Sequence, residues 1–378
     1  MKIELFTNSV EAGEIAATAQ AVSGKWLLNG PEVVGFEKEF AEHFGFKHAI
    51  AMNSGTAGLH SALAVIGMKS GDEVVLPAFN FIAAGCAVMQ AGGKPVFCDV
   101  AEDGNMDPAS LVRMMSERTK AVLVLHYAGR PADLTEIRTI AEKYKAVVIE
   151  DAAHALGAKH DDDPIGRSDG AVVFSFGPAK HLVTCMGGMV VTEDSRVADK
   201  LRQFRSYGMD RSMFSREGKE KAWSYGVPNL GHNFRMPDPL AAMGRGQIRK
   251  IDEIIRVRRE IARAYDGCLT PYVEHIHPVP TVCERGLDSP LYYVVRLVNP
   301  AKRDAFVEGL NAMGVSATVH WDKLLPEFAV FGSQSTDDYP ISLALSRSVA
   351  TLPLHQNLTT DERDFVVQAV GAVLADLA

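Results

Sequence analysis

Short apolar runs alternate with segments of helical periodicity between residues 45 and 195. Several of these runs are almost entirely apolar, which is typical of strands that are covered on both faces of a sheet. Strands separated by helices predict βαβ units and a mainly parallel sheet. The expected strands cover residues 49–52, 73–76, 95–99, 121–126, 147–151, 171–176 and 188–192.

Helical spacing marks several of the intervening segments. Residues 56–66 repeat apolar side chains at positions i, i+3, i+4 and i+7. Asp107 and Asp133 are suited to cap helices predicted over residues 108–117 and 134–144. Ligands of parallel sheets bind beyond the carboxyl ends of the strands, so the residues directly after the strands are the first candidates for a site.

The pattern changes after residue 195. Residues 203–238 are rich in Gly, Ser, Arg and aromatic residues, and they predict a long ordered loop. A single long helix is expected from residue 239 to about residue 265, and the remainder predicts a small α+β domain. The predicted fold is therefore an α/β protein. Its large domain (residues 1–250) holds a mixed, mainly parallel seven-stranded sheet with helices on both faces, and its smaller α+β domain covers residues 251–378.

Composition and charge narrow the class of partner. The 378 residues carry 39 basic and 47 acidic side chains, a formal charge of −8, which argues against nucleic acid as the main partner. Five scattered cysteines without a CxxC pair indicate reduced thiols in a cytoplasmic protein. The first 22 residues lack a signal-peptide pattern, and no apolar run is long enough to predict a membrane span.

Common catalytic signatures are missing from the sequence. It contains no GxSxG, no GxxxxGK[ST] and no HExxH, and its histidines show no metal-ligand spacing. His320 and His355 are interpreted as packed side chains. Serine, nucleotide and metal-assisted hydrolysis therefore have little support, and no metal is expected.

The segment Asn53-Ser54-Gly55-Thr56-Ala57 stands where a strand ends and a helix begins. Gly55 allows close backbone approach, and free amides together with the Thr56 hydroxyl are suited to hold a phosphate. A merely capped helix start explains the same residues, and taken alone it is the more frequent use.

Asp151 ends the apolar strand over residues 147–151, so its carboxylate lies at the ligand edge of the sheet. There it is suited to pair with a positive group, and the small Ala153 leaves room for a flat ring. A capping role explains Asp151 equally well in isolation.

Lys180 follows the segment Ser175-Phe176-Gly177-Pro178 just after another strand. An enclosed lysine has a lowered pKa and is able to form a Schiff base with a carbonyl, although most lysines are solvated surface groups. Phe81, in the loop after residues 73–76, is suited to stack on a planar ligand, although a core position is more common for phenylalanine.

Together these four features describe one ligand, a planar cationic ring with an aldehyde and a phosphate. Pyridoxal 5′-phosphate has all of these parts. The lysine would hold the aldehyde, the carboxylate would keep the ring nitrogen protonated, and amides with the Thr56 and Ser175 hydroxyls would hold the phosphate.

At this point the sequence resembles the DegT/DnrJ/EryC1/StrS sugar aminotransferases, pyridoxal phosphate enzymes of fold type I in the aspartate aminotransferase superfamily. The likeness runs almost the whole length, in blocks that keep their order. The blocks are Gly30-Pro31 with residues 36–41, and residues 53–57, 95–99, 126–133, 150–158, 175–180, 231–236 and 352–355.

The resemblance implies a role for each matching residue. Lys180 forms the internal aldimine and moves the proton between cofactor and substrate, and Asp151 pairs with the pyridine nitrogen. Phe81 stacks on the ring, and His154 lies near the ring hydroxyl. The phosphate is held by Gly55, Thr56, Ala57 and Ser175.

Asn233 occupies the position that reaches the phosphate of the neighbouring subunit, which implies a homodimer with shared active sites. Where many members read Thr-Gly-Glu-Gly-Gly, this chain reads Thr184-Cys185-Met186-Gly187-Gly188, so a polar group near the cofactor is lost. Dehydratases of the family carry histidine in place of the lysine. Here His181 follows Lys180, which favours transamination.

The implied reaction transfers an amino group from L-glutamate to a keto sugar, expected to be a nucleotide-linked 3-keto or 4-keto deoxysugar, in aminosugar, polysaccharide or natural-product biosynthesis. Alternatives are transamination of a keto-inositol (an aminocyclitol aminotransferase), a pyridoxal phosphate-dependent sugar dehydration, and a regulatory protein that binds the cofactor without turnover. Trp223, Tyr225, Trp321 and Lys323 are candidates for sugar contacts, but packing between subunits is the favoured use of the aromatic residues.

Overall fold

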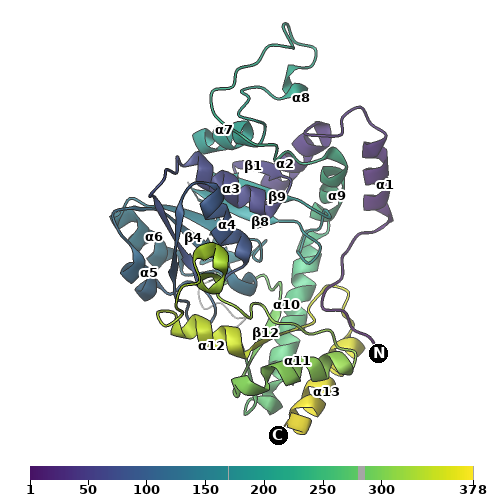
Figure 1. Ribbon diagram of the computed structural model, residues 1–378. Helices are drawn as coiled ribbons and strands as arrows, with labels where there is room; N and C mark the ends of the chain where they lie inside the picture. The colour runs from purple at the N-terminus through teal and green to yellow at the C-terminus, as the bar shows by residue number, and fades with distance from the viewer. Residues whose placement is uncertain (169, 280–285, 378) are drawn as a thin grey trace.

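A seven-stranded mixed sheet forms the centre of the computed structural model, which describes residues 1–168, 170–279 and 286–377 (Figure 1). The strand order is β1-β9-β8-β5-β4-β2-β3, and β9 runs antiparallel to the other six. This sheet confirms the predicted fold class. Its strands are β1 (His48–Met52), β2 (Glu73–Pro77), β3 (Lys94–Cys98), β4 (Thr119–Leu125), β5 (Val147–Asp151), β8 (Ala171–Ser175) and β9 (Gly188–Thr192).

Helices cover both faces of this sheet, because successive strand residues point to opposite sides. Ile50 and Met52 of β1 pack into one buried core, whereas Ala49 and Ala51 pack into another. The first core includes residues of α3 (Gly55–Val65), α4 (Ile82–Gln90) and α7 (Ser195–Phe204). The second includes residues of α2 (Pro31–Phe44), α5 (Pro108–Met114), α6 (Leu134–Lys143) and α9 (Asp238–Ile248).

A third core lies among the C-terminal elements, around a small antiparallel sheet. Ile3 belongs to this core and pairs with Val315, so the start of the chain packs with its C-terminal part. A division at residue 250 remains a proposal. The elements of this part are α10 (Ile251–Cys268), β10 (Ile276–Pro278), β12 (Tyr293–Leu297), α11 (Arg303–Ala312), α12 (Pro340–Ser348), β13 (Val349–Leu352) and α13 (Thr360–Leu377).

The single long helix expected from residue 239 is wrong, because the structure divides it into α9 and α10. The backbone of Lys250 leaves the helical conformation between them, with φ −120° and ψ 5°. Its ammonium group reaches the N-terminal helix α1 (Ala12–Val22) and lies 2.7 Å from the Glu14 carboxylate. The chain therefore turns a corner at Lys250, where this long-range ion pair joins it to α1.

The expected long loop holds one short helix, α8 (Met213–Arg216), and projects from the body (Figure 1). We call residues 208–231 the arm. Backbone hydrogen bonds at its base, from Tyr207 to His232 and from His232 to Phe204, hold its two ends together.

The remaining elements are short. A second three-stranded sheet contains β6 (Lys159–His160), β7 (Asp163–Pro164) and β11 (Gly286–Leu287). The 3₁₀ helices are η1 (Tyr127–Gly129), η2 (Thr270–Tyr272), η3 (Pro300–Lys302), η4 (Leu325–Glu327) and η5 (Ala329–Phe331).

Two further expectations concern the cysteines and the membrane. Cys86, Cys98, Cys185 and Cys268 are free thiols, whereas Cys283 lies outside the described residues. None of the helices within the described ranges combines the length and apolarity needed to cross a bilayer.

Candidate active site

A cavity of about 260 Å³ opens at the carboxyl ends of the parallel strands, where ligands of such sheets bind. It brings together seven of the nine predicted site residues. They are Gly55, Thr56, Phe81, Asp151, His154, Ser175 and Lys180. The other lining residues are Leu59, Asn80, Ala83, Leu125, Ala153, Tyr292, His320 and Trp321.

The N-terminus of α3 forms one end of the cavity. Ser54 caps this helix, because its hydroxyl accepts a hydrogen bond of 3.0 Å from the backbone N–H of Ala57. A Cβ at Gly55 would lie 2.9 Å from Cβ of Ser175, so only glycine lets these segments approach so closely. The exposed Thr56 adds a hydroxyl beside a helix N-terminus, which favours negative charge.

Ala57 and Asn233 do not line the cavity. The N–H of Ala57 is already used by the Ser54 cap, so the structure gives it no free donor. Asn233 is exposed at the base of the arm, where its side-chain oxygen accepts a hydrogen bond of 2.9 Å from Nε of Arg235. Its expected contact belongs to a second subunit and remains a proposal.

Asp151 and Lys180 place one negative and one positive group in the cavity. Lys180 stands in a turn, in which its own backbone N–H donates a hydrogen bond of 3.1 Å to the carbonyl of Gly177. Burial lowers the pKa of Lys180 to about 8, although Asp151 opposes the shift. Burial also raises the pKa of Asp151, against the opposing effects of a 3.0 Å hydrogen bond from the Ala153 N–H and of the Lys180 charge.

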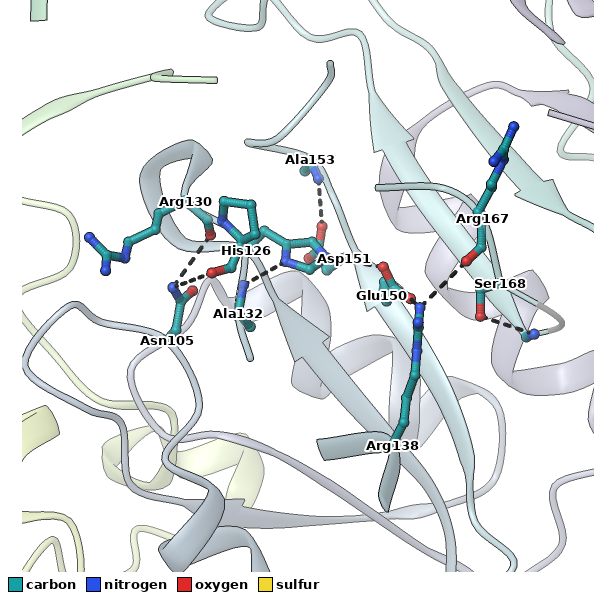
Figure 2. A network of polar contacts seen from close by, with 12 residues as sticks. Asn105, His126, Arg130, Ala132, Arg138, Glu150, Asp151, Ala153, Arg167 and Ser168 are labelled. Atoms are coloured by element: carbon teal, nitrogen blue, oxygen red, sulfur yellow. Dashed lines mark hydrogen bonds and ion pairs between the residues drawn. The ribbon is translucent and has the colours of Figure 1, made fainter. Parts of the chain in front are cut away.

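A second buried carboxylate, that of Glu150, precedes Asp151 on β5 (Figure 2). The Ala132 N–H donates to Nδ1 of His126, so Nε2 of this ring carries the proton that faces Glu150 at 3.2 Å. Arg138 binds the other Glu150 oxygen at 2.9 Å. Burial raises the pKa of Glu150, but His126 and Arg138 outweigh burial and hold it below its usual value.

His154 is buried beside the cavity, and its Nδ1 has no hydrogen-bond partner among the described residues. The Tyr292 ring meets it edge-on at 5.1 Å, and the Trp321 ring lies 6.1 Å away at 24°. Burial, with the nearby Lys180, holds the pKa of His154 well below its ordinary value, so the ring is neutral. An unpaired buried nitrogen of this kind fits a polar group of a ligand.

Tyr292, His320 and Trp321 form a part of the cavity that the motifs did not reveal; we call these three residues the C-terminal wall. His320 was expected to be merely packed, yet its ring borders the cavity. Trp321, a candidate for sugar contacts, lines the cavity and contacts Phe79 and Tyr127 of its own chain, while its favoured use in packing between subunits stays a prediction. The residues stand alone in segments without a regular pattern, so the sequence offered no signal beyond their types.

In contrast, we call Gly55, Thr56, Asp151, Ser175 and Lys180 the floor of the cavity. Each of them lies at or just after the end of a strand of the central sheet, or at the start of the helix that follows. The floor is therefore positioned by the sheet itself.

A model of the DegT/DnrJ/EryC1/StrS aminotransferase family matches residues 8–371. The UDP-4-amino-4-deoxy-L-arabinose–oxoglutarate aminotransferase of Shewanella sediminis is 31% identical to this chain, over 97% of each protein. The GDP-perosamine synthase of Caulobacter vibrioides is 32% identical over 99% of this chain and 98% of that protein. The crystal structure of the aminotransferase TlmJ from Streptoalloteichus hindustanus has a TM-score of 0.91 and 31% identity, with 100% of both chains covered.

The family model spans nearly the whole chain, and relatives of more than 30% identity cover it almost completely. These matches agree with the blocks of sequence that indicated the family and with the strand-end cavity. The chain therefore belongs to the DegT/DnrJ/EryC1/StrS aminotransferase family and is an enzyme of the aminotransferase class.

Proposed function

We propose that this protein uses pyridoxal 5′-phosphate to transfer an amino group from L-glutamate to a nucleotide-linked keto sugar. One observation carries the proposal. The Lys180 amine and the Asp151 carboxylate converge in one cavity with Gly55 and Thr56 in the first turn of α3.

The residues that line the cavity fit this cofactor. The Gly55 position has no room for a side chain, and the adjoining first turn of α3 offers backbone N–H groups to a phosphate. Thr56 and Ser175 would add hydroxyls there. The unpaired Nδ1 of His154 would face a polar substituent of the ring, and the half-exposed Phe81 would cover one ring face.

The cofactor, when bound, supplies an electron sink that stabilises negative charge on the substrate carbon. Nζ of Lys180 would take the proton from Cα of the donor amino acid and deliver it to the carbon of the cofactor that carried the aldehyde oxygen. With a pKa of about 8, roughly one in ten Lys180 side chains is uncharged at pH 7, against roughly one in three thousand for an unperturbed lysine.

Asp151 would hold the ring nitrogen in its protonated state. The Ala153 N–H fixes one carboxylate oxygen, so the carboxylate keeps one orientation. A positive partner would also offset the cost of burial, which otherwise raises the pKa of Asp151.

The names of the relatives support a sugar acceptor. Both curated relatives described above are named for amino sugars carried on a nucleoside diphosphate, and their similarity extends over almost all of this chain. L-Glutamate as the donor agrees with the oxoglutarate in the name of the Shewanella protein.

We further propose a homodimer with shared active sites. The arm exposes Trp223 at 79% and Leu230 at 85%, apolar side chains that a second subunit packed against the arm would bury. Asn233 stands at the base of this arm, which suits the role expected for it in the neighbouring subunit.

Purified holoenzyme should convert L-glutamate into 2-oxoglutarate when a nucleotide-linked 3-keto or 4-keto sugar or a keto-inositol is supplied. Detection of 2-oxoglutarate together with an aminated product supports transamination and identifies the acceptor. Loss of water from the sugar without 2-oxoglutarate would instead establish a dehydratase. Cofactor absorbance without turnover on any donor would favour a regulatory protein.

A further inference from the structure

The C-terminal wall contributes two side chains with hydrogen-bonding atoms, Tyr292 and His320, to the lining of the cavity. The rings of Tyr292 and His320 are stacked, with centroids 4.4 Å apart and planes at 17°. Nδ1 of His320 lies 3.0 Å from the hydroxyl of Thr351 on β13, which fixes the orientation of the imidazole. Both side chains are half-buried and border the cavity, so the pair is rigid without being sealed off.

One polar side-chain atom of each residue is available to a ligand. Neither the Tyr292 hydroxyl nor Nε2 of His320 makes a hydrogen bond to any residue that the structure describes, and neither belongs to the fully buried unpaired atoms. Polar atoms on an ordered wall of a cavity are suited to bind a ligand, because little side-chain freedom is lost when the bonds form.

The C-terminal wall is also uncharged. Burial lowers the pKa of His320 to about 4 and raises that of Tyr292 to about 12, so both rings are neutral near pH 7. Among the described residues that line the cavity, Asp151 and Lys180 are the charged ones, and the proposed function assigns both to the cofactor. The charge of Arg258 also acts on Tyr292, but this guanidinium is buried and already donates to the carbonyls of Leu291 and Leu354. A carboxylate placed against the wall would therefore lose its hydration, and Lys180, which the proposed function uses for proton transfer, is the only positive group among the described lining residues.

We propose that the C-terminal wall recognises the acceptor as an uncharged, hydroxyl-bearing sugar ring, with hydrogen bonds to the Tyr292 hydroxyl and to Nε2 of His320, and that it discriminates against rings that carry a carboxylate. This inference rests on the proposed function and narrows its substrate class. The carboxylates of L-glutamate must then lie elsewhere in the site, so the two substrates use different parts of it.

Matched probes test the discrimination by equilibrium binding to the holoenzyme. UDP-glucose and UDP-glucuronate differ by one carboxylate, as do GDP-mannose and GDP-mannuronate. The enzyme is expected to bind the pair that carries its preferred nucleotide, UDP or GDP. Within that pair, calorimetry should give a dissociation constant at least tenfold lower for the nucleotide with the uncharged sugar. Equal or tighter binding of the acid overturns the inference. So does a holoenzyme that reacts with L-glutamate but binds none of the four probes more tightly than UDP or GDP alone.

Substitutions test the two atoms. Tyr292→Phe removes only the hydroxyl, and His320→Asn keeps a polar group near Thr351 while removing the one at Nε2. Each should weaken binding of the uncharged probe about tenfold and slow the acceptor half-reaction much more than the glutamate half-reaction. His320→Gln, which restores a polar group near the position of Nε2, should recover part of the loss.

Tyr144→Phe, at the end of α6, is the matched control and should leave both half-reactions and the melting temperature unchanged. Equal slowing of both half-reactions by Tyr292→Phe, or a response of probe binding no larger than that of the control, overturns the inference. If the holoenzyme does not react with L-glutamate at all, the proposed function fails instead.

Discussion

The floor of the cavity and its C-terminal wall are built in different ways. The floor residues stand at the carboxyl ends of β1, β5 and β8, which run parallel to one another in the central sheet, so the topology brings them together. The C-terminal wall comes from segments outside that sheet, and side-chain packing on Phe79, Tyr127 and Thr351 holds it in place. If the proposed roles hold, the comparison teaches that the reaction chemistry depends on sheet topology and the choice of substrate on long-range packing.

Replacing Lys180 by alanine is the strongest test of the floor. Transamination should fall by about a thousandfold or more, because no other described amine lines the cavity to move the proton. Steady-state formation of 2-oxoglutarate measures the loss. Lys143→Ala, on the exposed surface of α6, is the control, and a Lys180→Ala enzyme with more than a tenth of normal activity would contradict the assigned role.

Asp151→Asn and Glu150→Gln compare neighbouring carboxylates on the same strand. The first should slow turnover roughly a hundredfold, since it removes charge beside the reacting group. The second should affect turnover less and lower the melting temperature more, because Glu150 is bound by His126 and Arg138. Similar turnover rates for both variants would contradict the assignment of Asp151 to the reaction and of Glu150 to the stability of the fold.

The pH dependence of cofactor uptake tests the environment of Lys180. The uncharged amine is the nucleophile, so the rate at which apoenzyme takes up pyridoxal 5′-phosphate should rise with pH and level off above about 8. Between pH 7 and pH 8 the expected increase is roughly fivefold. Stopped-flow absorbance measures it, and a rate still rising steadily towards pH 10.5 would show an ordinary lysine.

Thr351→Val tests the support of the C-terminal wall with the smallest expected effect. It removes the hydroxyl that orients His320 and should slow the acceptor half-reaction roughly threefold, the usual value of one neutral hydrogen bond. The glutamate half-reaction should change less. A larger effect on the glutamate half-reaction would show that His320 serves the floor instead.

The floor could be predicted from the sequence because its signals are local. Asp151 ends an apolar strand, and Gly55 begins a helix after one, so position along the chain already implied position in the sheet. The central sheet and several helix caps were predicted for the same reason; the carboxylates of Asp107 and Asp133 accept hydrogen bonds at the starts of α5 and α6.

The rest depends on partners that are distant in sequence. The corner between α9 and α10 lies where Lys250 pairs with Glu14, a contact distant in sequence that helical periodicity could not reveal. Tyr292 and His320 become neighbours only when β13 of the C-terminal part pairs with β12 on one side and with Thr318 on the other. The use of Ala57 at the phosphate stays a prediction, since either the Ser54 hydroxyl or a phosphate is able to accept its N–H.

The contacts of Glu150 with His126 and Arg138 affect the electric field inside the molecule. Two carboxylates on adjacent residues would repel each other strongly in a medium of low polarity, yet β5 directs them to opposite sides of the sheet. On the side of the sheet away from Asp151, the positive charge of Arg138 offsets the negative charge of Glu150 (Figure 2). Strand β5 thus keeps the Glu150 carboxylate and the Asp151 carboxylate on different faces of the sheet, each with its own positive partner or site. The exposed Arg138 thereby compensates the charge of Glu150, and Asp151 is the only carboxylate among the described residues that line the cavity.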